Sequence, residues 1–502
     1  MYKTAMLDKS VQTGGAICSL VIIYVVTKVI WRLCFHPLSK YPGPKPWAVT
    51  SLINTFYVFK ATRIYKISEL HNKYGPVVRV GPNELSYVDE QAWKGIYSAH
   101  KPGGELQKHM PAINALGGYG IFHNPNDAEH ARIRKLLSTG FSEKAIRDRE
   151  GIIQRYISLL MTRMRERAGR GDMVDATWWF DCLGADLAGE LGYGESFGAL
   201  ETSTLPDFVP VIDKLLRGLT IGLALGQYPI LRNIGGVLRK MSPFEGIFKE
   251  IVGSKVGRRE KRFDAGQTAE VRDFYSLLTR NEGEAVQQLS PKTIRIISGD
   301  LIVGGSDTTA TGLSVAIYLL LKNPSKLEIL TKEIRSAFTS EDEITMISTN
   351  SLKYQSAVIS ESMRMYPAGP ETTRRITNDG GNVICGQFVP GGTLVGVYHW
   401  AAGHNKAAWK DADSFVPERW LGDKRYEGDV RGVLNVWNSG PRNCLGQNFA
   451  LAHMKLVLAR LIWTFDLELC SESEDYMNVG ASVLVYHKGP LMIRMKSVRG
   501  GD

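Results

Sequence analysis

Several features of common protein classes are missing from this sequence. Only six of its 502 residues are cysteine, and no two of them form a Cys-x-x-Cys pair. A disulfide framework or a zinc ribbon therefore has no support, and a reducing, cytosol-facing environment fits better. No Gly-x-Gly-x-x-Gly fingerprint or flavin-domain pattern is present, so the sequence gives no sign of a nicotinamide- or flavin-binding domain. No Lys/Arg-rich block or nucleic-acid module stands out, so nucleic acid is not an expected partner.

The composition is globular with a basic balance. Apolar residues make up 44% of the chain and charged residues 22%, which is the range of ordinary folded domains. The length allows one large enzyme domain, and no internal repeat or interdomain linker divides the chain. The formal net charge is +10. Two interpretations of this charge stay open: a solvated basic surface, or attraction to an acidic partner or to anionic lipid.

A long apolar run occurs near the N-terminus. It extends from Gly14 to Phe35, and its only charged residues are Lys28 and Arg32; about 20 apolar residues suffice to span a bilayer's hydrocarbon core. A cleaved signal peptide is the alternative, but the run is long for one and no small-residue cleavage site follows cleanly. We therefore predict that residues 1–36 are a retained, single-pass anchor. The basic residues after the run predict that the rest of the chain faces the cytosol.

Residues 37–502 are predicted to form one catalytic domain, mainly α with small β-sheets. Prolines at positions 37–46 remove amide donors and predict a stiff, non-helical connector. Residues 71–88 contain the strings VVRVG and ELSYV, which predict a small hairpin sheet. The patterns at 127–137 and 180–197 predict helices, the first basic and amphipathic and the second packed in the interior. The apolar stretch 206–241 is either ordinary core or a substrate-entry lid on the membrane.

The longest predicted helix has clear ends. Ser290 is a suitable N-cap, and Pro291 suits the first helical position. The pattern continues to Lys322 and stops at Asn323-Pro324. At a rise of 1.5 Å per residue, such a helix is about 45–50 Å long, enough to cross a whole domain.

Cys444 lies in a glycine-rich loop that leads into a helix. The loop reads WNSGPRNCLG over positions 437–446. A glycine-rich turn can aim backbone amides at the sulfur, and a helix N-terminus lowers the pKa of a thiol beside it. Arg442 adds a cation that can hold an anionic cofactor group. By itself, a cysteine before a helix is also compatible with a redox sensor or a nucleophile.

The complete string is more specific. It resembles the haem-ligand motif of the cytochrome P450 family, Phe-x-x-Gly-x-Arg-x-Cys-x-Gly, at Gly440, Arg442, Cys444 and Gly446. Trp437 takes the place of the phenylalanine. It can still shield the sulfur, although its ring N–H could change the hydrogen bonding of the thiolate and the potential of the iron. The resemblance implies haem b as cofactor, with Cys444 as the axial ligand of its iron.

Two more family motifs occur upstream, in the expected order. Glu361 and Arg364 lie three residues apart on one helix face, and Arg419 follows in the string FVPERW. By resemblance these residues form the family's Glu-Arg-Arg triad, which supports the haem-side core, whereas a lone Glu-x-x-Arg is usually a surface ion pair.

The second motif is GGSDTT, at positions 304–309 of the long helix. Two glycines inside a helix cost roughly 1 kcal/mol each, and the family's reason for them is a local groove above the haem. Asp307 and Thr308 match its acid–alcohol pair, which delivers protons during oxygen activation. A helix kink for packing is the alternative.

The two propionates of haem should attract cations. By resemblance, Arg134, Arg374 and Arg442 are the candidates, and His130 stands where the family often has tryptophan. Arg375 is the neighbour that could be confused with Arg374.

The resemblance covers essentially the whole chain and implies an activity. The segments FHPL, YPGPK, ICGQFVPGG and VPERWLGD look most like fungal members that modify mycotoxins and other specialised metabolites. The implied enzyme is a haem-thiolate monooxygenase that inserts one atom of dioxygen into a lipophilic small molecule. Its electrons would come from NADPH through the separate P450 reductase of the same membrane, with cytochrome b5 as an additional partner. Arg132 and Lys135 are candidates for docking the acidic face of the reductase.

Two other functions stay open. A haem-thiolate isomerase, dehydratase or peroxide-using enzyme would keep the fold, although the Asp307-Thr308 pair argues against it. A membrane-tethered haem sensor or carrier would need no proton relay. The substrate-pocket walls implied by the resemblance are mostly apolar; they comprise residues 110–122, 206–241, Gly304, Thr372-Thr373 and 480–484.

Overall fold

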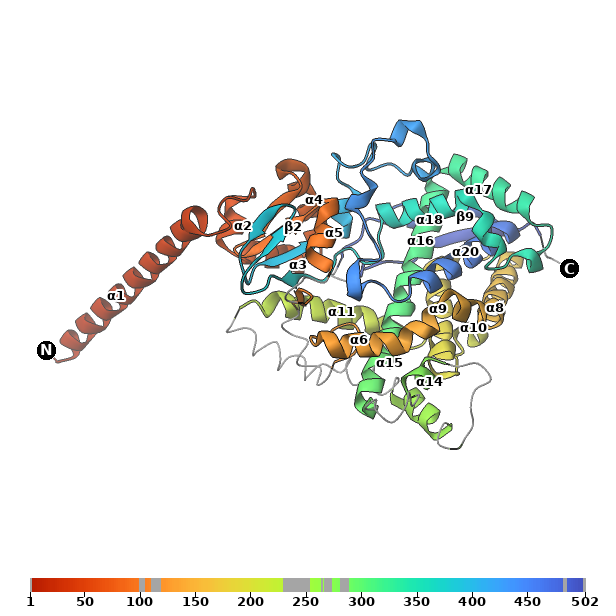
Figure 1. Ribbon diagram of the computed structural model, residues 1–502, viewed down its shortest axis with the longest axis horizontal. Helices are drawn as coiled ribbons and strands as arrows, with labels where there is room; N and C mark the ends of the chain where they lie inside the picture. The colour runs from red at the N-terminus through yellow and green to blue at the C-terminus, as the bar shows by residue number, and fades with distance from the viewer. Residues whose placement is uncertain are drawn as a thin grey trace.

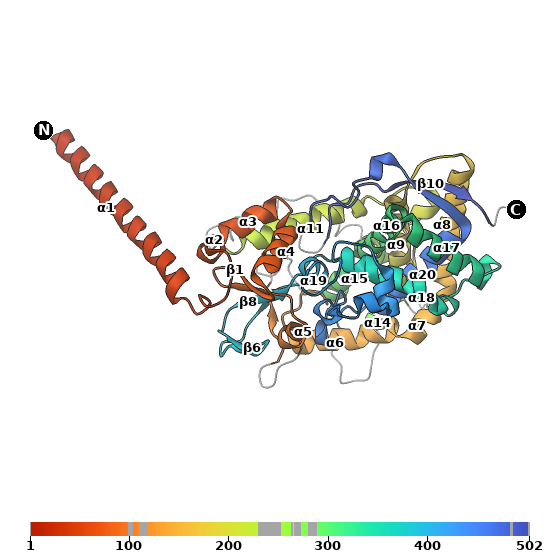
Figure 2. The ribbon, with the colours of Figure 1, turned by 90° about the horizontal axis from the view of Figure 1, so that it is seen from above.

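The computed structural model describes residues 2–98, 104–109, 119–228, 253–262, 265, 273–279, 289–481 and 485–499. A single helix projects from one end of a larger body, and the two chain ends lie at opposite ends of the long axis (Figure 1). The view from above shows the same projection (Figure 2). The described chain is therefore mainly helical with small sheets, as predicted.

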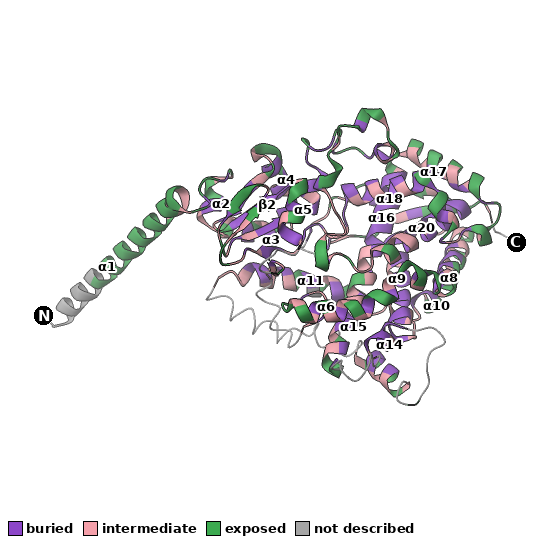
Figure 3. Cartoon of the chain, in the orientation of Figure 1, coloured by how far each residue is buried: buried purple, intermediate pink, exposed green. Residues whose placement is uncertain are grey.

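The projecting element is the predicted anchor. α1 (Tyr2–Ile30) continues into a π-helical turn, Trp31–Phe35. Thr13–Phe35 have a mean hydropathy of 2.0, and none of that stretch is buried. Leu20 and Ile22 are each more than 60% exposed, and Figure 3 shows this exposure along the described side chains of the helix. An exposed apolar helix of this length is suited to a bilayer rather than to water.

The connector after α1 is docked rather than loose. The guanidinium of Arg79 donates to the carbonyl of Arg32 at 2.9 Å. A Cβ at Gly43 would collide with the carbonyl oxygen of Arg79, so only glycine allows this close approach. One part of the connector prediction was wrong. α2 (Lys45–Val49) is helical, with Pro46 in its first turn, where the missing amide has no intrahelical partner to lose.

The described strands form small sheets at separate places in the body. The largest has the order β1-β2-β8-β5-β3, and the others are β4-β10-β9 and the hairpin β6-β7. β1 and β2 are antiparallel, which confirms the predicted hairpin, and β2 pairs in parallel with the distant β8. The strands are β1 (Val77–Gly81), β2 (Glu84–Tyr87), β3 (Gln107–Lys108), β4 (Val174–Asp175), β5 (Arg375–Ile376), β6 (Asn382–Ile384), β7 (Gln387–Val389), β8 (Leu394–Val397), β9 (Phe465–Leu469) and β10 (Met492–Ser497).

The helices pack around a buried central pair. α16 and α9 lie in the interior of the helical part, as their purple ribbons in Figure 3 show. The helix predicted at 127–137 is α6 (Asp127–Ser138). The helix predicted at 180–197 is α9 (Ala176–Tyr193), which ends four residues earlier because Gly194 caps it in the left-handed conformation. The remaining helices are α3 (Leu52–Phe59), α4 (Arg63–Tyr74), α5 (Glu90–Tyr97), α7 (Glu143–Arg147), α8 (Glu150–Gly169), α10 (Ala199–Thr202), α11 (Phe208–Leu225), α14 (Phe274–Leu278), α15 (Pro291–Gly305), α16 (Asp307–Lys322), α17 (Pro324–Ala337), α18 (Lys353–Met365), α19 (His399–Gly403) and α20 (Gln447–Thr464).

The predicted long helix has the expected ends but a break in its middle. The hydroxyl of Ser290 accepts the amide of Thr293 at 3.1 Å, which confirms the N-cap. α15 ends at Gly305 and α16 begins at Asp307, with Ser306 between them. The Ser306 hydroxyl donates to the Ile302 carbonyl at 2.8 Å. Such back-bonding bends helices, and the two glycines before it offer little resistance.

Parts of the expected pocket lie outside the described residues. These parts are 110–118, 229–241 and 482–484. Within the stretch 206–241, α11 forms a helix whose Phe208 and Ile212 are buried, so its described half contributes to the core.

Candidate active site

Hydrogen bonds of the main chain shape the cysteine loop. The amide of Cys444 donates to the carbonyl of Trp437 at 2.8 Å, and the amide of Asn443 donates to that of Gly440 at 3.1 Å. The amides of Gly446 and Gln447, at the start of α20, donate to the Cys444 sulfur. The turn therefore presents two N–H groups to the sulfur, as its glycines predict. Trp437 contributes its carbonyl to the loop.

The two glycines of the loop are needed for different reasons. Gly440 has a φ of +74°, and a Cβ there would collide with the carbonyl oxygen of Tyr97. Gly446 has a negative φ, and the nearest atom to an added Cβ is Cε1 of Phe141, at 4.0 Å. The described protein atoms thus leave space beside Gly446, which is room that a flat cofactor can use.

Opposing effects act on the thiol of Cys444. Burial raises its pKa, while the amides of Gly446 and Gln447 at the helix start and the charge of Arg134 lower it. The lowering by the helix start is the effect that the sequence predicts, and burial exceeds it. The residue nevertheless has accessible surface. Metal coordination deprotonates a thiol outright, so the protein need only stabilise the anion.

The central helix also has an open side. An added Cβ at Gly304 or Gly305 would meet no atom of the described residues within 4 Å, although the nearby Ile302 and Ser306 are buried. The hydroxyl of Thr308 donates to the carbonyl of Gly304 at 2.7 Å. This side of the helix therefore faces space, as expected for a groove.

Residues 119–127 connect the helix with the cysteine loop. The amide of Phe122 donates to Oδ2 of Asp300, on α15, at 3.0 Å. Two residues later, the carbonyl of Asn124 accepts from the guanidinium of Arg442 at 2.7 Å. Residues 119–127 are thus bound at one point to α15, one turn before Gly304. At another point they are bound to the cysteine loop.

A buried cluster of cations lies beside the loop. Arg442 is paired with Glu105 at 2.5 Å and with Asp127 at 2.8 Å. Burial, followed by the charges of Arg442, Lys108 and Arg134, lowers the pKa of His130 to about 3. Burial and the neighbouring arginines also lower the pKa of Lys108. The lowered pKa values reflect, besides burial, repulsion between the basic groups of this cluster, which an anionic ligand would relieve.

Arg375 belongs to this cluster, and Arg374 does not contribute its side chain to it. Burial and Arg442 lower the pKa of Arg375 to about 10, and its buried Nη1 has no hydrogen-bond partner among the described residues. Arg374 is instead paired with Glu84 at 3.1 Å. Neighbouring residues of an extended chain point to opposite sides, so the sequence alone could not choose between the two arginines. The unpartnered guanidinium nitrogen fits a haem propionate.

Arg134 contacts the cysteine loop itself. Its Nη1 donates to the carbonyl of Asn443 at 2.8 Å, and its Nη2 donates to the Asn443 side chain. Its positive charge lowers the pKa of Cys444. In this structure Arg134 therefore supports the loop and the sulfur.

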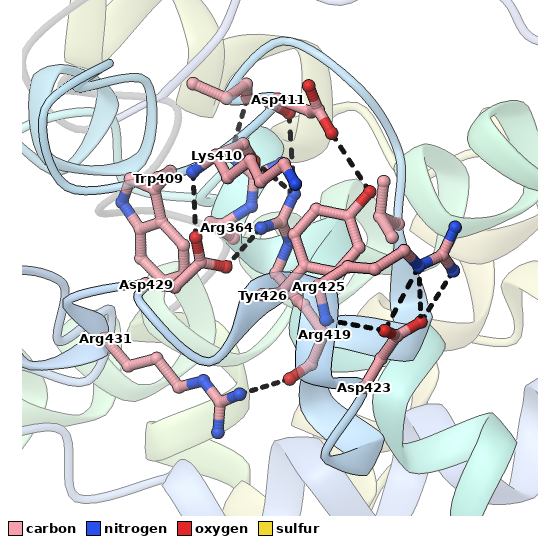
Figure 4. A network of polar contacts seen from close by, with 12 residues as sticks. Arg364, Trp409, Lys410, Asp411, Arg419, Asp423, Arg425, Tyr426, Asp429 and Arg431 are labelled. Atoms are coloured by element: carbon pink, nitrogen blue, oxygen red, sulfur yellow. Dashed lines mark hydrogen bonds and ion pairs between the residues drawn. The ribbon is translucent and has the colours of Figure 1, made fainter.

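The structure brings the predicted Glu-Arg-Arg triad together. Glu361 Oε1 lies 2.8 Å from Arg364 Nη2 and 3.0 Å from Arg419 Nε, with all three side chains inaccessible. A fourth member was not predicted: Asp429 is paired with Arg419. Figure 4 shows the Arg419 guanidinium between the Asp429 carboxylate and the Tyr426 ring. No motif marks Asp429, because it follows Arg419 in an irregular loop.

Asp307 is paired with a lysine that the sequence did not single out. Lys488 Nζ lies 3.0 Å from Oδ1 of Asp307 and 3.1 Å from Oδ1 of Asp181. Asp307 is on α16, Asp181 is on α9 and Lys488 is in the segment before β10. Only folding brings the three residues together.

A Gly-x-Ser-x-Gly string at positions 194–198 is not a hydrolase site. A nucleophile elbow connects a strand to a helix, whereas this string follows α9. The Ser196 hydroxyl donates to Asp186 at 2.7 Å, which holds the turn.

An accessible cysteine at a helix start, beside buried basic residues, fits the arrangement of a haem-thiolate protein. The family model "Cytochrome P450" matches residues 42–495, and the chain belongs to the cytochrome P450 family. Among its relatives, the cytochrome P450 monooxygenase aclL of Aspergillus oryzae is 36% identical, over 95% of this chain and 97% of the relative. The monooxygenase astA of Talaromyces wortmannii is 35% identical, over 96% and 97%. Averantin hydroxylase of Dothistroma septosporum is 34% identical, over 94% and 89%.

The family fixes the class of chemistry. The protein is a cytochrome P450 monooxygenase, an oxidoreductase that incorporates oxygen from dioxygen. The family implies a haem with a cysteine thiolate ligand, a redox partner and a small-molecule substrate.

Proposed function

We propose that Cys444 is the thiolate ligand of haem b, and that the enzyme inserts one atom of dioxygen into a lipophilic small molecule of fungal specialised metabolism. The observation that carries this proposal is the geometry of the loop: Cys444 keeps accessible surface, and its sulfur accepts the amides of Gly446 and Gln447 at the start of α20. Residues 37–502 are the proposed catalytic domain, and residues 1–36 its anchor. The name averantin hydroxylase, given to one relative, supports hydroxylation as the reaction type.

The cofactor side of the site is assigned to the residues around the loop. Arg442, Arg375 and His130 are proposed to hold the propionates, and Arg134 to support the sulfur. Arg374, which the sequence favoured, is paired with Glu84 and is assigned to the sheet. Gly440 and Gly446 shape the turn, and Trp437 covers it.

Asp307 and Thr308 are the proposed catalytic pair. When bound, the haem supplies the reductive activation of dioxygen. Thr308 uses its hydroxyl proton to bind the Gly304 carbonyl at 2.7 Å, so its oxygen lone pairs remain to accept a hydrogen bond from the open side. Asp307 is adjacent and carries a titratable group. Together they can move a proton from solvent into the groove.

The electron partner is proposed to be the NADPH–P450 reductase of the endoplasmic reticulum membrane, with cytochrome b5 as an additional donor. The catalytic domain then faces the cytosol. Lys135 is exposed on α6, and Arg132, on the same helix, is paired with Glu129 at 2.8 Å. The docking contribution of Lys135 should therefore be the larger of the two.

Cys444→Ala tests the ligand. The reduced protein under carbon monoxide should show the red-shifted Soret band of thiolate ligation, and this variant should lose it. Cys385→Ala is the matched control, because Cys385 lies in the turn between β6 and β7, and it should keep the band. A band that survives Cys444→Ala would place the ligand elsewhere.

A further inference from the structure

Three charged side chains from distant parts of the chain meet at Asp307, the residue that precedes Thr308. Lys488 Nζ lies 3.0 Å from Asp307 Oδ1 and 3.1 Å from Asp181 Oδ1. The exposed fractions of the side chains are 11% for Lys488, 12% for Asp181 and 19% for Asp307. Water screens such buried ion pairs only weakly. Electrostatic attraction therefore holds the three side chains together in addition to packing.

The charges of this cluster do not balance. Lys488 is the one cation within 4 Å of both carboxylates in the described part of the chain. Burial and the neighbouring Asp307 raise the pKa of Asp181, although Lys488 opposes the shift. The carboxylates in turn raise the pKa of Lys488 despite its burial. Lys488 therefore keeps its proton, and the two carboxylates share a single counter-charge.

Asp307 is held on one side only. Its Oδ1 is paired with Lys488, and its carbonyl accepts from the Thr311 hydroxyl at 2.8 Å. Its Oδ2 accepts no hydrogen bond from any described residue. One oxygen is thus fixed, and the other is available to carry a proton.

The segment that carries Lys488 is itself anchored at several points. The amide of His487 donates to the carbonyl of Gly480 at 2.8 Å, and its ring lies 3.4 Å from Asp213 of α11. The amide of Leu491 donates to Asp175 at 2.9 Å. Because both sides of Lys488 are fixed, its ammonium group is placed at Asp307 by the fold.

We infer that Lys488, held by Asp181, is a positioning residue that fixes the Asp307 carboxylate next to Thr308 and leaves Oδ2 free to transfer a proton. This inference rests on the proposed role of the Asp307-Thr308 pair. Asp307 takes a proton from solvent on Oδ2 and passes it on toward the Thr308 side, and Lys488 loses none. Without Lys488, two neighbouring carboxylates lack a counter-charge and Asp307 turns away from the groove.

Lys488→Gln in the full-length holoenzyme, with reductase and a substrate that shifts the haem spectrum, tests the inference. The product formed per NADPH should fall by about tenfold, the scale of an impaired proton transfer, with a matching rise in hydrogen peroxide and little change in KM. Lys488→Arg should restore most of the coupling. Lys322→Gln is the matched control: Lys322 is at the exposed far end of α16, the helix that carries Asp307, and is paired with Glu474, so this variant should stay coupled.

A second measurement does not depend on turnover. The infrared C–O stretching band of the ferrous carbon monoxide complex senses the polar groups near the open side of the haem. Lys488→Gln should shift or broaden this band, and Lys488→Arg should not. Asp181→Asn combined with Lys488→Gln should recover part of the band shape and of the stability, because it removes the repulsion between the two carboxylates.

The stability of the Asp181→Asn single variant has a defined pH dependence. The raised pKa of Asp181 means that the folded protein binds its proton more tightly than the unfolded chain does. This contribution stabilises the fold at low pH and is lost as pH rises through the raised pKa. As pH rises from the ordinary carboxyl pKa to the raised pKa of Asp181, the free energy of unfolding should therefore fall less in the variant than in the parent.

Two results separate this inference from the proposed function. If the thiolate Soret band is present in the parent but Lys488→Gln is as well coupled as the parent, with an unchanged infrared band, Lys488 is not a positioning residue. If the parent itself lacks that Soret band, the haem-ligand proposal fails first.

Discussion

Gly440 shows how one residue can determine the shape of the cysteine loop. We expect Gly440→Ala to destabilise the protein by about 1–3 kcal/mol, because a left-handed φ and a collision with the Tyr97 carbonyl act together. Chemical denaturation measures the loss. Gly428→Ala is the control, since its Cβ would meet nothing within 4 Å, and it should stay within about 0.5 kcal/mol of the parent. Equal losses in both variants would contradict the steric account.

At the residue scale, the sequence predicted what lies inside contiguous motifs. Cys444, Asp307, Thr308 and the triad all follow from short strings with fixed spacing. Lys488 and Asp429 could not be found this way, because each acquires its role from a partner brought close by folding. The choice of Arg375 over Arg374 depended on the direction of two adjacent side chains, which no spacing rule decides.

Among the elements, α15 fixes a neighbouring segment through one carboxylate. Asp300→Ala should release residues 119–127, because the Phe122 amide loses its acceptor. The expected cost is about 1–3 kcal/mol, and hydrogen exchange at the Phe122 amide should accelerate. Asp300→Asn keeps a carbonyl oxygen as acceptor and should preserve most of the protection. Unchanged exchange in the alanine variant would mean that other contacts hold the segment.

Periodicity and capping residues predicted those elements whose formation depends on residues close together in the sequence. The hairpin at β1 and β2, the cap at Ser290 and the helix end before Pro324 all follow from neighbouring residues. A kink within GGSDTT was left open as an alternative, and its position at Ser306 could not be predicted, since glycine and serine weaken a helix without fixing where it bends. The parallel pairing of β2 with β8 joins residues such as Glu84 and Leu394, and only tertiary packing brings them together.

For the whole molecule, the boundary between anchor and body is testable by truncation. A chain that starts at residue 37 should no longer be found in the membrane fraction. It should also unfold at a lower temperature than a chain that starts at residue 29. The shorter chain loses Arg32, whose carbonyl accepts from Arg79 and whose guanidinium donates to the Val49 carbonyl. Each lost hydrogen bond costs about 1 kcal/mol. Thermal unfolding compares the two chains, and equal midpoints would show that Arg32 adds nothing to the body.

The overall architecture and the chemical class could be predicted because the motifs occur in a fixed order along the chain. The substrate could not be predicted. Its pocket combines segments from several distant regions, and the relatives share only about a third of their residues with this chain.

The close contact between Gly43 and Arg79 has a further consequence for the enzyme in its membrane. The connector between the anchor and the body is fixed to the first sheet. Contacts within the body therefore set the tilt of the catalytic domain relative to the membrane. An unrelated hydrophobic helix joined at Trp31 should therefore hold the enzyme at the same height, and substrates dissolved in the lipid would approach it from the same direction.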